Sequence, residues 1–403
     1  MKLRLEKKKI DAFAVCYVIF FTQLNLILHA FTFFSGSLTS VLYLLMRALF
    51  VTVIIWCAFN NYRRVVNALL IPMLIIALYY ITSIRLGNNF KYVSDALQEN
   101  LFLQCLPAYF CSYLLEDYSG LKMIIKKFAY VLLIGGIGIV LFQIIFGSSA
   151  FQVNYLNLSY CLTVPFVYFL LTDDRKKIYI GILIGDAILI LLFGGRSAIL
   201  CIAVALVYKF IFVDKNRSLW IIAIGISGFL LFFFYDSILT WIVKTSSSYG
   251  ISGGIQKYYN MGSIFLDSGR GSINDSVLEI IGMNPYVGVG LGADRYYLGC
   301  YGFQYGWYPH NLFYELMIDF GVVIWFLVFA YFLIQIVRVL FGNNQCGEGD
   351  LLLKICIFTG GFIVLLFSNS YLRSPMFFAM IAVMIKNRYS LKYAFRRNNR
   401  DSN

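Results

Sequence analysis

Long apolar runs recur along the whole chain, and short polar segments separate them. About twelve of these runs have close to the ~20 residues that an α-helix needs to cross a bilayer. The runs lie at 11–33, 37–59, 65–84, 100–116, 128–146, 153–172, 178–194, 197–213, 219–236, 311–337, 351–369 and 372–388. The pattern predicts an all-α polytopic membrane protein with about twelve transmembrane helices.

One long polar segment interrupts this series and divides the chain into three predicted parts. Residues 1–236 are expected to form an N-terminal transmembrane bundle of about nine spans. Residues 237–310 are expected to form a large external loop with short surface helices, among them an amphipathic helix at "SINDSVLEII". Residues 311–403 are expected to hold the C-terminal transmembrane helices and a basic tail.

The composition agrees with a polytopic membrane protein, and the distribution of charge predicts the orientation of the chain in the membrane. Hydrophobic residues make up 60% of the chain and charged residues 13%. A net charge of +13 would suggest nucleic acid as a partner of a soluble chain, but most of the 33 Lys and Arg residues fall on one side when the runs are threaded alternately. The bias of Lys and Arg toward cytoplasmic loops therefore explains the charge and excludes nucleic acid. Both termini are predicted to be cytoplasmic, and the long loop is predicted to be external.

Cysteine usage and the N-terminus exclude other classes. The nine Cys residues are scattered singly, with no C-x-x-C pair, so neither a disulfide framework nor structural zinc is expected. The basic start "MKLRLEKKK" leads into an apolar run that is too long for a signal peptide, so the first helix is expected to be retained.

Five arginines are not explained by the cytoplasmic bias, because they lie at predicted outer ends or in outer loops: Arg85, Arg196, Arg270, Arg295 and Arg373. An arginine guanidinium presents a planar fork of donors that matches phosphate oxygens, so these residues suggest an anionic ligand. Local alternatives exist for three of them. Arg196 could anchor its turn at the interface, Arg270 could pair with Asp267 or Asp275, and Arg295 could pair with Asp294.

The stretch "WYPHNLFYELMIDFG" at 307–321 carries the most informative polar residues. Pro309 favours a helix start close to His310. Asn311, Glu315 and Asp319 then follow at i, i+4 and i+8 and form one polar stripe on an apolar helix. His310 and Glu315 are candidate bases for a hydroxyl group, although His310 could also be a helix cap and Glu315 could pair with an outer arginine.

Glycines and aromatic residues fill the loop before this helix. The run "GVGLGA" follows Asn284-Pro285 and heads no βαβ unit, so it predicts a tight loop whose backbone approaches a ligand or another helix, and not a dinucleotide site. The aromatic residues of this loop suit stacking against sugar faces and equally suit an interfacial belt: Tyr296, Tyr297, Tyr301, Phe303, Tyr305, Trp307 and Tyr308.

These motifs together resemble the O-antigen polymerase and ligase superfamily of multi-pass bacterial membrane proteins, which includes the Wzy-type polysaccharide polymerases. The resemblance rests on "GGRSAIL", a loop arginine, "NPYVGVGLG" and "PHNLFYELMIDFG" in that order, and it covers roughly residues 190–330. It implies a GT-C-like, metal-independent glycosyltransferase without cofactors at the bacterial inner membrane, with its active site facing the periplasm or exterior.

The resemblance also implies the substrates and the roles of individual residues. Glycans carried on undecaprenyl pyrophosphate would be the substrates, and a chain-length regulator and a flippase would be partners alongside the lipid bilayer. Arg196 and Arg270 match the arginines thought to hold pyrophosphate, and Arg295 is a third candidate for that role. His310 matches the family histidine, and Asn311 and Tyr308 are expected to contact substrate.

Within this interpretation, polymerisation of repeat units into O-antigen or capsular polysaccharide is favoured over ligation to lipid A core. The loop has one His and no second basic cluster for a phosphorylated core acceptor. A flippase or transporter is the alternative from another class, but it would be expected to show internal repeats that the sequence lacks. A non-catalytic scaffold is disfavoured by the acidic stripe.

Overall fold

The computed structural model describes residues 2–30, 36–146, 155–172, 177–193, 195–214, 240, 244, 270–341 and 348–386. All secondary structure within these ranges is helical, which confirms the all-α prediction. The predicted run at 219–236 and most of the predicted loop before residue 270 lie outside the described residues.

Within the described ranges, seven helices are long and apolar enough to cross a membrane, and three shorter apolar helices accompany them. The seven are Lys7–Ala30, Ser40–Asn60, Tyr62–Asp95, Leu121–Phe142, Arg196–Val213, Leu312–Phe341 and Glu348–Phe367. The shorter ones are Leu156–Leu171, Ile178–Phe193 and Pro375–Lys386. The multi-pass character is therefore confirmed, while the total of about twelve spans stays a prediction.

The described residues fall into two compact units, and the helices α1 (Lys2–Ala30) and α2 (Gly36–Asn60) contribute to both. Unit 1 comprises residues 1–20, 49–122 and 268–403. Its other elements are α3 (Tyr62–Leu86), η2 (Gly87–Phe90), α4 (Lys91–Leu97), η3 (Gln98–Cys105), α5 (Leu106–Leu114), α12 (Arg270–Met283), α13 (Asp294–Cys300), α14 (Leu312–Phe341), α15 (Glu348–Phe358), α16 (Ile363–Phe367), η6 (Tyr371–Arg373) and the helix Pro375–Lys386.

Unit 2 comprises residues 21–48 and 123–267. It contains α6 (Leu121–Phe146), apart from its first two residues, α7 (Tyr155–Leu171), α8 (Lys177–Phe193), α9 (Arg196–Val207) and η5 (Tyr208–Val213). The turn before α9 approaches α7 closely, because a Cβ atom on Gly195 would lie 1.9 Å from Ser159 Oγ. Gly195 therefore permits close packing between these two helices at the Arg196 turn.

In unit 1 the helix α14 is broken near its beginning. Gly321 has φ 80° and ψ 166°, so the helical backbone stops there and resumes at the next residue. The carbonyls of Ile318 and Asp319 accept hydrogen bonds from Val289 N at 2.7 Å and Gly290 N at 3.1 Å. Backbone groups that leave the helical ladder are therefore satisfied by the segment 284–292.

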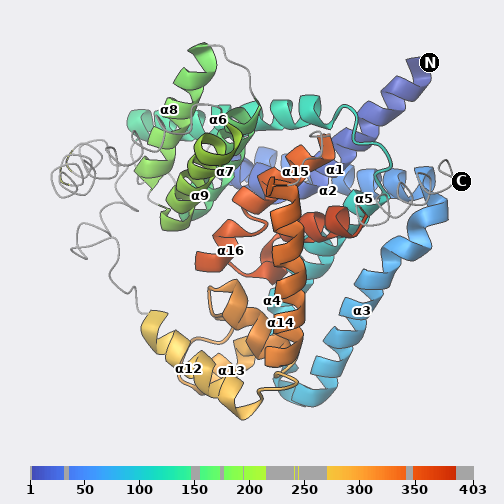
Figure 1. Ribbon diagram of the computed structural model, residues 1–403, viewed down its shortest axis with the longest axis vertical. Coiled ribbons are helices and arrows are strands. Elements are labelled where there is room, and N and C mark those ends of the chain that lie inside the picture. The colour runs from blue at the N-terminus through green and yellow to red at the C-terminus, as the bar shows by residue number, and fades with distance from the viewer. Residues whose placement is uncertain are drawn as a thin grey trace, which may run out of the picture. The chain divides into compact units, whose positions relative to one another are not determined.

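The glycine-rich segment 284–292 is thus a loop that docks against a helix, as its sequence predicted. A Cβ on Gly288 would lie 2.5 Å from Asp319 O, and Gly288 has φ 71°. From the other side, Arg85 at the end of α3 donates to Gly288 O at 2.8 Å and to Asn284 Oδ1 at 3.2 Å. In Figure 1, α12 and α13 lie beside the same end of α14, in agreement with their contacts. The loop therefore joins α3 to the broken helix.

We expect Gly321→Ala to lower the free energy of unfolding by at least about 2 kcal/mol, because it combines a left-handed backbone with a backbone clash. The added Cβ would lie 2.3 Å from Tyr286 O. Thermal unfolding in detergent measures the effect. Gly282→Ala is the matched control, since a Cβ there meets nothing within 4 Å and the position is helical. Equal melting temperatures for the two variants would contradict this account of the break.

Candidate functional site

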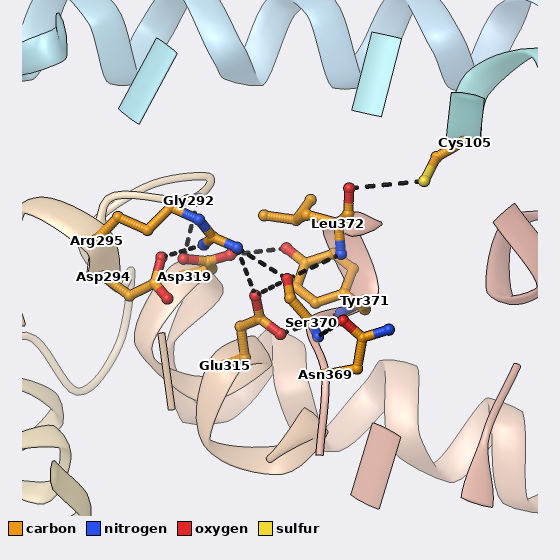
Figure 2. A network of polar contacts seen from close by, with 10 residues as sticks. All are labelled: Cys105, Gly292, Asp294, Arg295, Glu315, Asp319, Asn369, Ser370, Tyr371 and Leu372. Carbon is orange, nitrogen blue, oxygen red and sulfur yellow. Dashed lines mark hydrogen bonds and ion pairs between the residues drawn. The ribbon is translucent and has the colours of Figure 1, made fainter. Parts of the chain in front are cut away.

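A buried polar network lies at the beginning of α14 and connects three segments of unit 1 (Figure 2). We define it by the side chains of Asp294, Arg295, Glu315, Asp319, Ser370 and Tyr371. Asp294 and Arg295 begin α13, Glu315 and Asp319 lie on one face of α14, and Ser370 and Tyr371 belong to the turn before the last helix. The exposure of the first four side chains is at most 1%.

Glu315 is the most connected member of the network. Its Oε1 accepts hydrogen bonds from Arg295 Nη2 at 3.1 Å and from the Ser370 hydroxyl, and its Oε2 accepts from the backbone N of Tyr371 at 3.1 Å. A buried carboxylate is tolerated only when charge and hydrogen bonds compensate its desolvation. Glu315 therefore ties α13 and the 369–373 turn to the same point of α14.

Asp319 makes the second connection one helical turn further along. Its Oδ2 accepts from the Tyr371 hydroxyl at 2.7 Å, and its Oδ1 accepts from Gly292 N at 3.1 Å. The stripe predicted for α14 is thus present, and both of its acids point into protein. Asn311 ends the stripe as the helix cap, because its side-chain oxygen accepts from Phe313 N at 2.9 Å.

Arg295 carries the positive charge of this network. Its Nη1 donates to Asp294 Oδ1 at 2.6 Å, and its Nη2 donates to Glu315 and also to Ser370 Oγ at 2.8 Å. Burial alone would lower the pKa of Arg295, but the neighbouring carboxylates raise it above its ordinary value. Burial raises the pKa of Asp294, which the adjacent guanidinium partly opposes. The local pairing of Arg295 with Asp294 is therefore the arrangement in this structure.

Tyr308 connects the network to the segment just before α14. The guanidinium carbons of Arg295 and Arg373 lie 5.4 and 5.3 Å from the centroid of its ring, within the range of cation–π contact. The His310 ring lies 4.2 Å from the same ring. Burial raises the pKa of Tyr308, against the effect of Arg373, so its hydroxyl is protonated near neutral pH. We call these four side chains the Tyr308 site.

Unusual backbone conformations flank the Tyr308 site on both sides. In the described residues, His310 with φ 56° and Asn369 with φ 63° are the non-glycine residues in the left-handed region. One precedes α14, and the other precedes the turn that carries Ser370 and Arg373. Such conformations cost free energy and are kept where surrounding contacts enforce them, often at functional sites.

The predicted residues divide into those that the structure brings together and those that it does not. Arg295, Tyr308, His310, Asn311 and Glu315 lie together in unit 1, on α13 and around the beginning of α14. Arg196 begins α9 in unit 2, and it is partly buried. Arg270 begins α12, but its side chain lies outside the described residues. The roles of Arg196 and Arg270 as pyrophosphate ligands therefore remain predictions.

Sequence reasoning missed the 369–373 turn. Arg373 was one of the five outer arginines that suggested an anionic ligand, but no individual role was predicted for Arg373, Ser370 or Tyr371. The available signal was the polar stretch "SNSYLRS", which lies between two apolar runs and includes an arginine that the cytoplasmic bias does not explain. Nothing in the sequence indicated that this turn meets Glu315, which lies 55 residues earlier.

Aromatic residues of the 296–308 segment pack against α4. The Tyr305 ring stacks on the Tyr92 ring with centroids 4.0 Å apart, and the Tyr296 ring lies 6.2 Å from both. Tyr305 and Trp307 remain 44% and 42% exposed. These two side chains can still offer surface to a ligand.

Comparison with known families locates these features. Residues 181–329 match the family model Wzy_C, described as O-antigen ligase. The match confirms the resemblance found in the sequence, and it includes α13 and the beginning of α14. Proteins of this family are membrane enzymes of glycan assembly, of the O-antigen ligase or polymerase type, and they act on lipid-linked glycans. The matched region indicates an enzyme of this type. No curated protein matches the chain.

Removal of the Tyr371 hydroxyl tests the network. We expect Tyr371→Phe to lower the free energy of unfolding by about 1–3 kcal/mol, because the fully buried Asp319 carboxylate loses its 2.7 Å hydrogen bond. Tyr286→Phe is the control, since Tyr286 is 75% exposed. Unfolding in detergent, followed by near-ultraviolet circular dichroism, measures both variants. Equal stability of the two would show that the Tyr371 bond adds nothing.

Proposed function

We propose that this chain, whose residues 181–329 belong to the O-antigen ligase family, is a polysaccharide polymerase. It would join undecaprenyl-pyrophosphate-linked oligosaccharide repeat units into O-antigen or capsular polysaccharide at the outer face of the bacterial inner membrane. The observation that carries the proposal is the Tyr308 site, in which a histidine, a half-buried tyrosine and two arginines meet at the start of a membrane helix.

The reaction needs two kinds of assistance that this site offers. A hydroxyl oxygen of the acceptor glycan attacks the anomeric carbon of the donor glycan, and the bond from that carbon to the pyrophosphate oxygen breaks. The bonding electrons leave with undecaprenyl pyrophosphate, so positive charge nearby lowers the barrier. The hydroxyl proton has to pass to a base, and His310 is proposed for this role because histidine is the residue that most often acts as a general base.

Glu315 and Arg295 receive supporting roles in this mechanism. Glu315 was the second candidate base, but its two oxygens already accept three hydrogen bonds from within the protein. Arg295 was a candidate pyrophosphate ligand, but its two Nη atoms already donate to Asp294, Glu315 and Ser370. We therefore propose that both act by positioning the Tyr308 site, and that Arg196 and Arg270 contact pyrophosphate.

The orientation and architecture belong to the same proposal. The resemblance implies a GT-C-like arrangement, and the distribution of Lys and Arg favours both termini in the cytoplasm, which would put His310 at the outer surface. Fixed arginines would supply the charge that a divalent metal supplies in other glycosyltransferases, so the transfer is proposed to be metal-independent. Exposed Tyr305 and Trp307 are suited to stack against sugar rings of the substrate.

Ligation of glycan to lipid A core is the alternative, and the description of the matching family as O-antigen ligase favours it. The two activities share the donor and differ in the acceptor. Addition of a core acceptor to the assay separates them, because a ligase gives one product per acceptor and a polymerase gives a ladder.

We expect purified protein in detergent to convert an undecaprenyl-pyrophosphate-linked repeat unit into a ladder of multiples on a gel. His310→Ala should slow the ladder by about 10²- to 10⁴-fold, because proton transfer to the acceptor hydroxyl loses its base. Arg196→Ala and Arg270→Ala should also reduce it, through loss of leaving-group stabilisation. His29→Ala is the matched control, because the chain has two histidines and His29 lies in α1.

Two experimental outcomes would contradict parts of this proposal. If authentic substrate gives no ladder while the protein moves that lipid across vesicle membranes, the arginines serve transport. If a ladder forms and His310→Ala matches His29→Ala, the enzyme is a polymerase whose base is another group.

A further inference from the structure

The two arginines beside Tyr308 have different charge environments. Arg295 is fully buried, and Asp294 and Glu315 both form ion pairs with it. Its positive charge is therefore offset before any ligand arrives. Arg373 lies as close to the Tyr308 ring as Arg295 does, but no carboxylate among the described residues forms an ion pair with it.

Arg373 forms a side-chain hydrogen bond with Tyr308, and it also retains one unused donor. Its Nε atom, like that of Arg295, is buried and has no hydrogen-bond partner in the described parts of the chain. Its side chain as a whole is partly exposed, in contrast to that of Arg295. A buried N–H without an acceptor costs free energy. Asp294 interacts electrostatically with Arg373 but forms no ion pair with it, so Arg373 can still attract an anion. An oxygen atom of a ligand could accept a hydrogen bond from this N–H group.

The buried polar network holds the backbone of Arg373 in place. Ser370 Oγ accepts from Leu372 N at 3.2 Å, and Ser370 O accepts from Arg373 N at 3.1 Å. The carbonyl of Leu372 accepts from Cys105 Sγ at 3.5 Å, which fixes the turn to η3 (Figure 2). An arginine on a fixed turn spends little conformational entropy when it binds.

We propose that Arg373 is an anion-binding residue that takes a phosphate oxygen of an isoprenyl-linked pyrophosphate at the Tyr308 site. The assignment rests on the proposed function for the nature of the ligand, and on the charge environments of Arg295 and Arg373 for the residue. Arg373 lies outside residues 181–329, so the family match says nothing about it. The ring of Tyr308 then holds the guanidinium, and the phosphate lies on the same side of the network as His310.

Binding of a short isoprenyl pyrophosphate tests the assignment without requiring turnover. Titration calorimetry in detergent would use geranylgeranyl pyrophosphate and, separately, inorganic pyrophosphate. We expect Arg373→Ala to weaken the lipid probe by about 10- to 100-fold, as for loss of a charge-assisted contact, and Arg373→Lys to recover part of that loss. The wild-type affinity should fall as salt rises, because the contact is ionic.

Arg63→Ala is the matched control. Arg63 also lies over a tyrosine ring, at 5.7 Å from the centroid of Tyr62, but it is exposed. Arg63 lies at the beginning of α3, whereas Arg85, which contacts the loop 284–292, lies near the end of that helix. Arg63 is therefore roughly 33 Å along the helix from the contact with this loop. This variant should bind the probe like wild type. Melting temperatures of all three variants report whether each is folded.

The outcomes separate this inference from the proposed function. Unchanged affinity in a folded Arg373→Ala protein would overturn the assignment of Arg373, even if the ladder forms. Loss of binding in Arg373→Ala with partial recovery in Arg373→Lys would support it, even if no ladder forms. Equal affinity for inorganic pyrophosphate and the lipid probe would overturn the isoprenyl part of the assignment and make free phosphate the ligand.

Discussion

The arrangement of unit 1 around the site depends on the burial of one carboxylate. Glu315 lies fully inside the protein, and it is satisfied only because α13 contributes Arg295 and the 369–373 turn contributes Ser370 and Tyr371 N. A carboxylate left alone at that position would cost several kcal/mol. Three distant segments must therefore meet there, and the position of Tyr308 between two arginines follows from their meeting.

Backbone contacts at the break in α14 complement this charge cluster. The same loop that precedes α13 fills the break, through Gly288 and the amides of Val289 and Gly290. The beginning of α14 is therefore held both by the ion pairs of the network and by backbone hydrogen bonds to the segment 284–292. Both contacts are made within the protein, so the beginning of α14 is held in place by the chain itself.

The sequence predicted the helical class, the multi-pass character and the acidic stripe, because all three are periodic or local signals. The run at 65–84 became α3, and "SINDSVLEII" became part of α12. The start of α14 was expected close to His310 and lies at Leu312, since Asn311 caps it. Its break was not expected, because Gly321 gives no local sign of whether it bends a helix or lies within one.

Partners across long sequence separations were beyond the reach of sequence reasoning. Glu315 was recognised as paired or catalytic, and only the fold shows that Ser370 and Tyr371 share it with Arg295. The sequence alone does not show whether the charge environments of Arg295 and Arg373 differ. They differ because Asp294 and Glu315 form ion pairs with Arg295 and not with Arg373, and only the folded structure shows these pairs.

The break in α14 has a consequence for where the polar chemistry takes place. Hydrogen bonds join residues 285–290 to residues 318–322, so both segments lie at one depth, roughly 10 Å along the helix from Leu312. Inside a bilayer such irregular backbone is tolerated only where protein surrounds it. Part of the segment that was predicted to be an external loop therefore packs among the helices of unit 1, and its polar contacts lie below the level of the helix start.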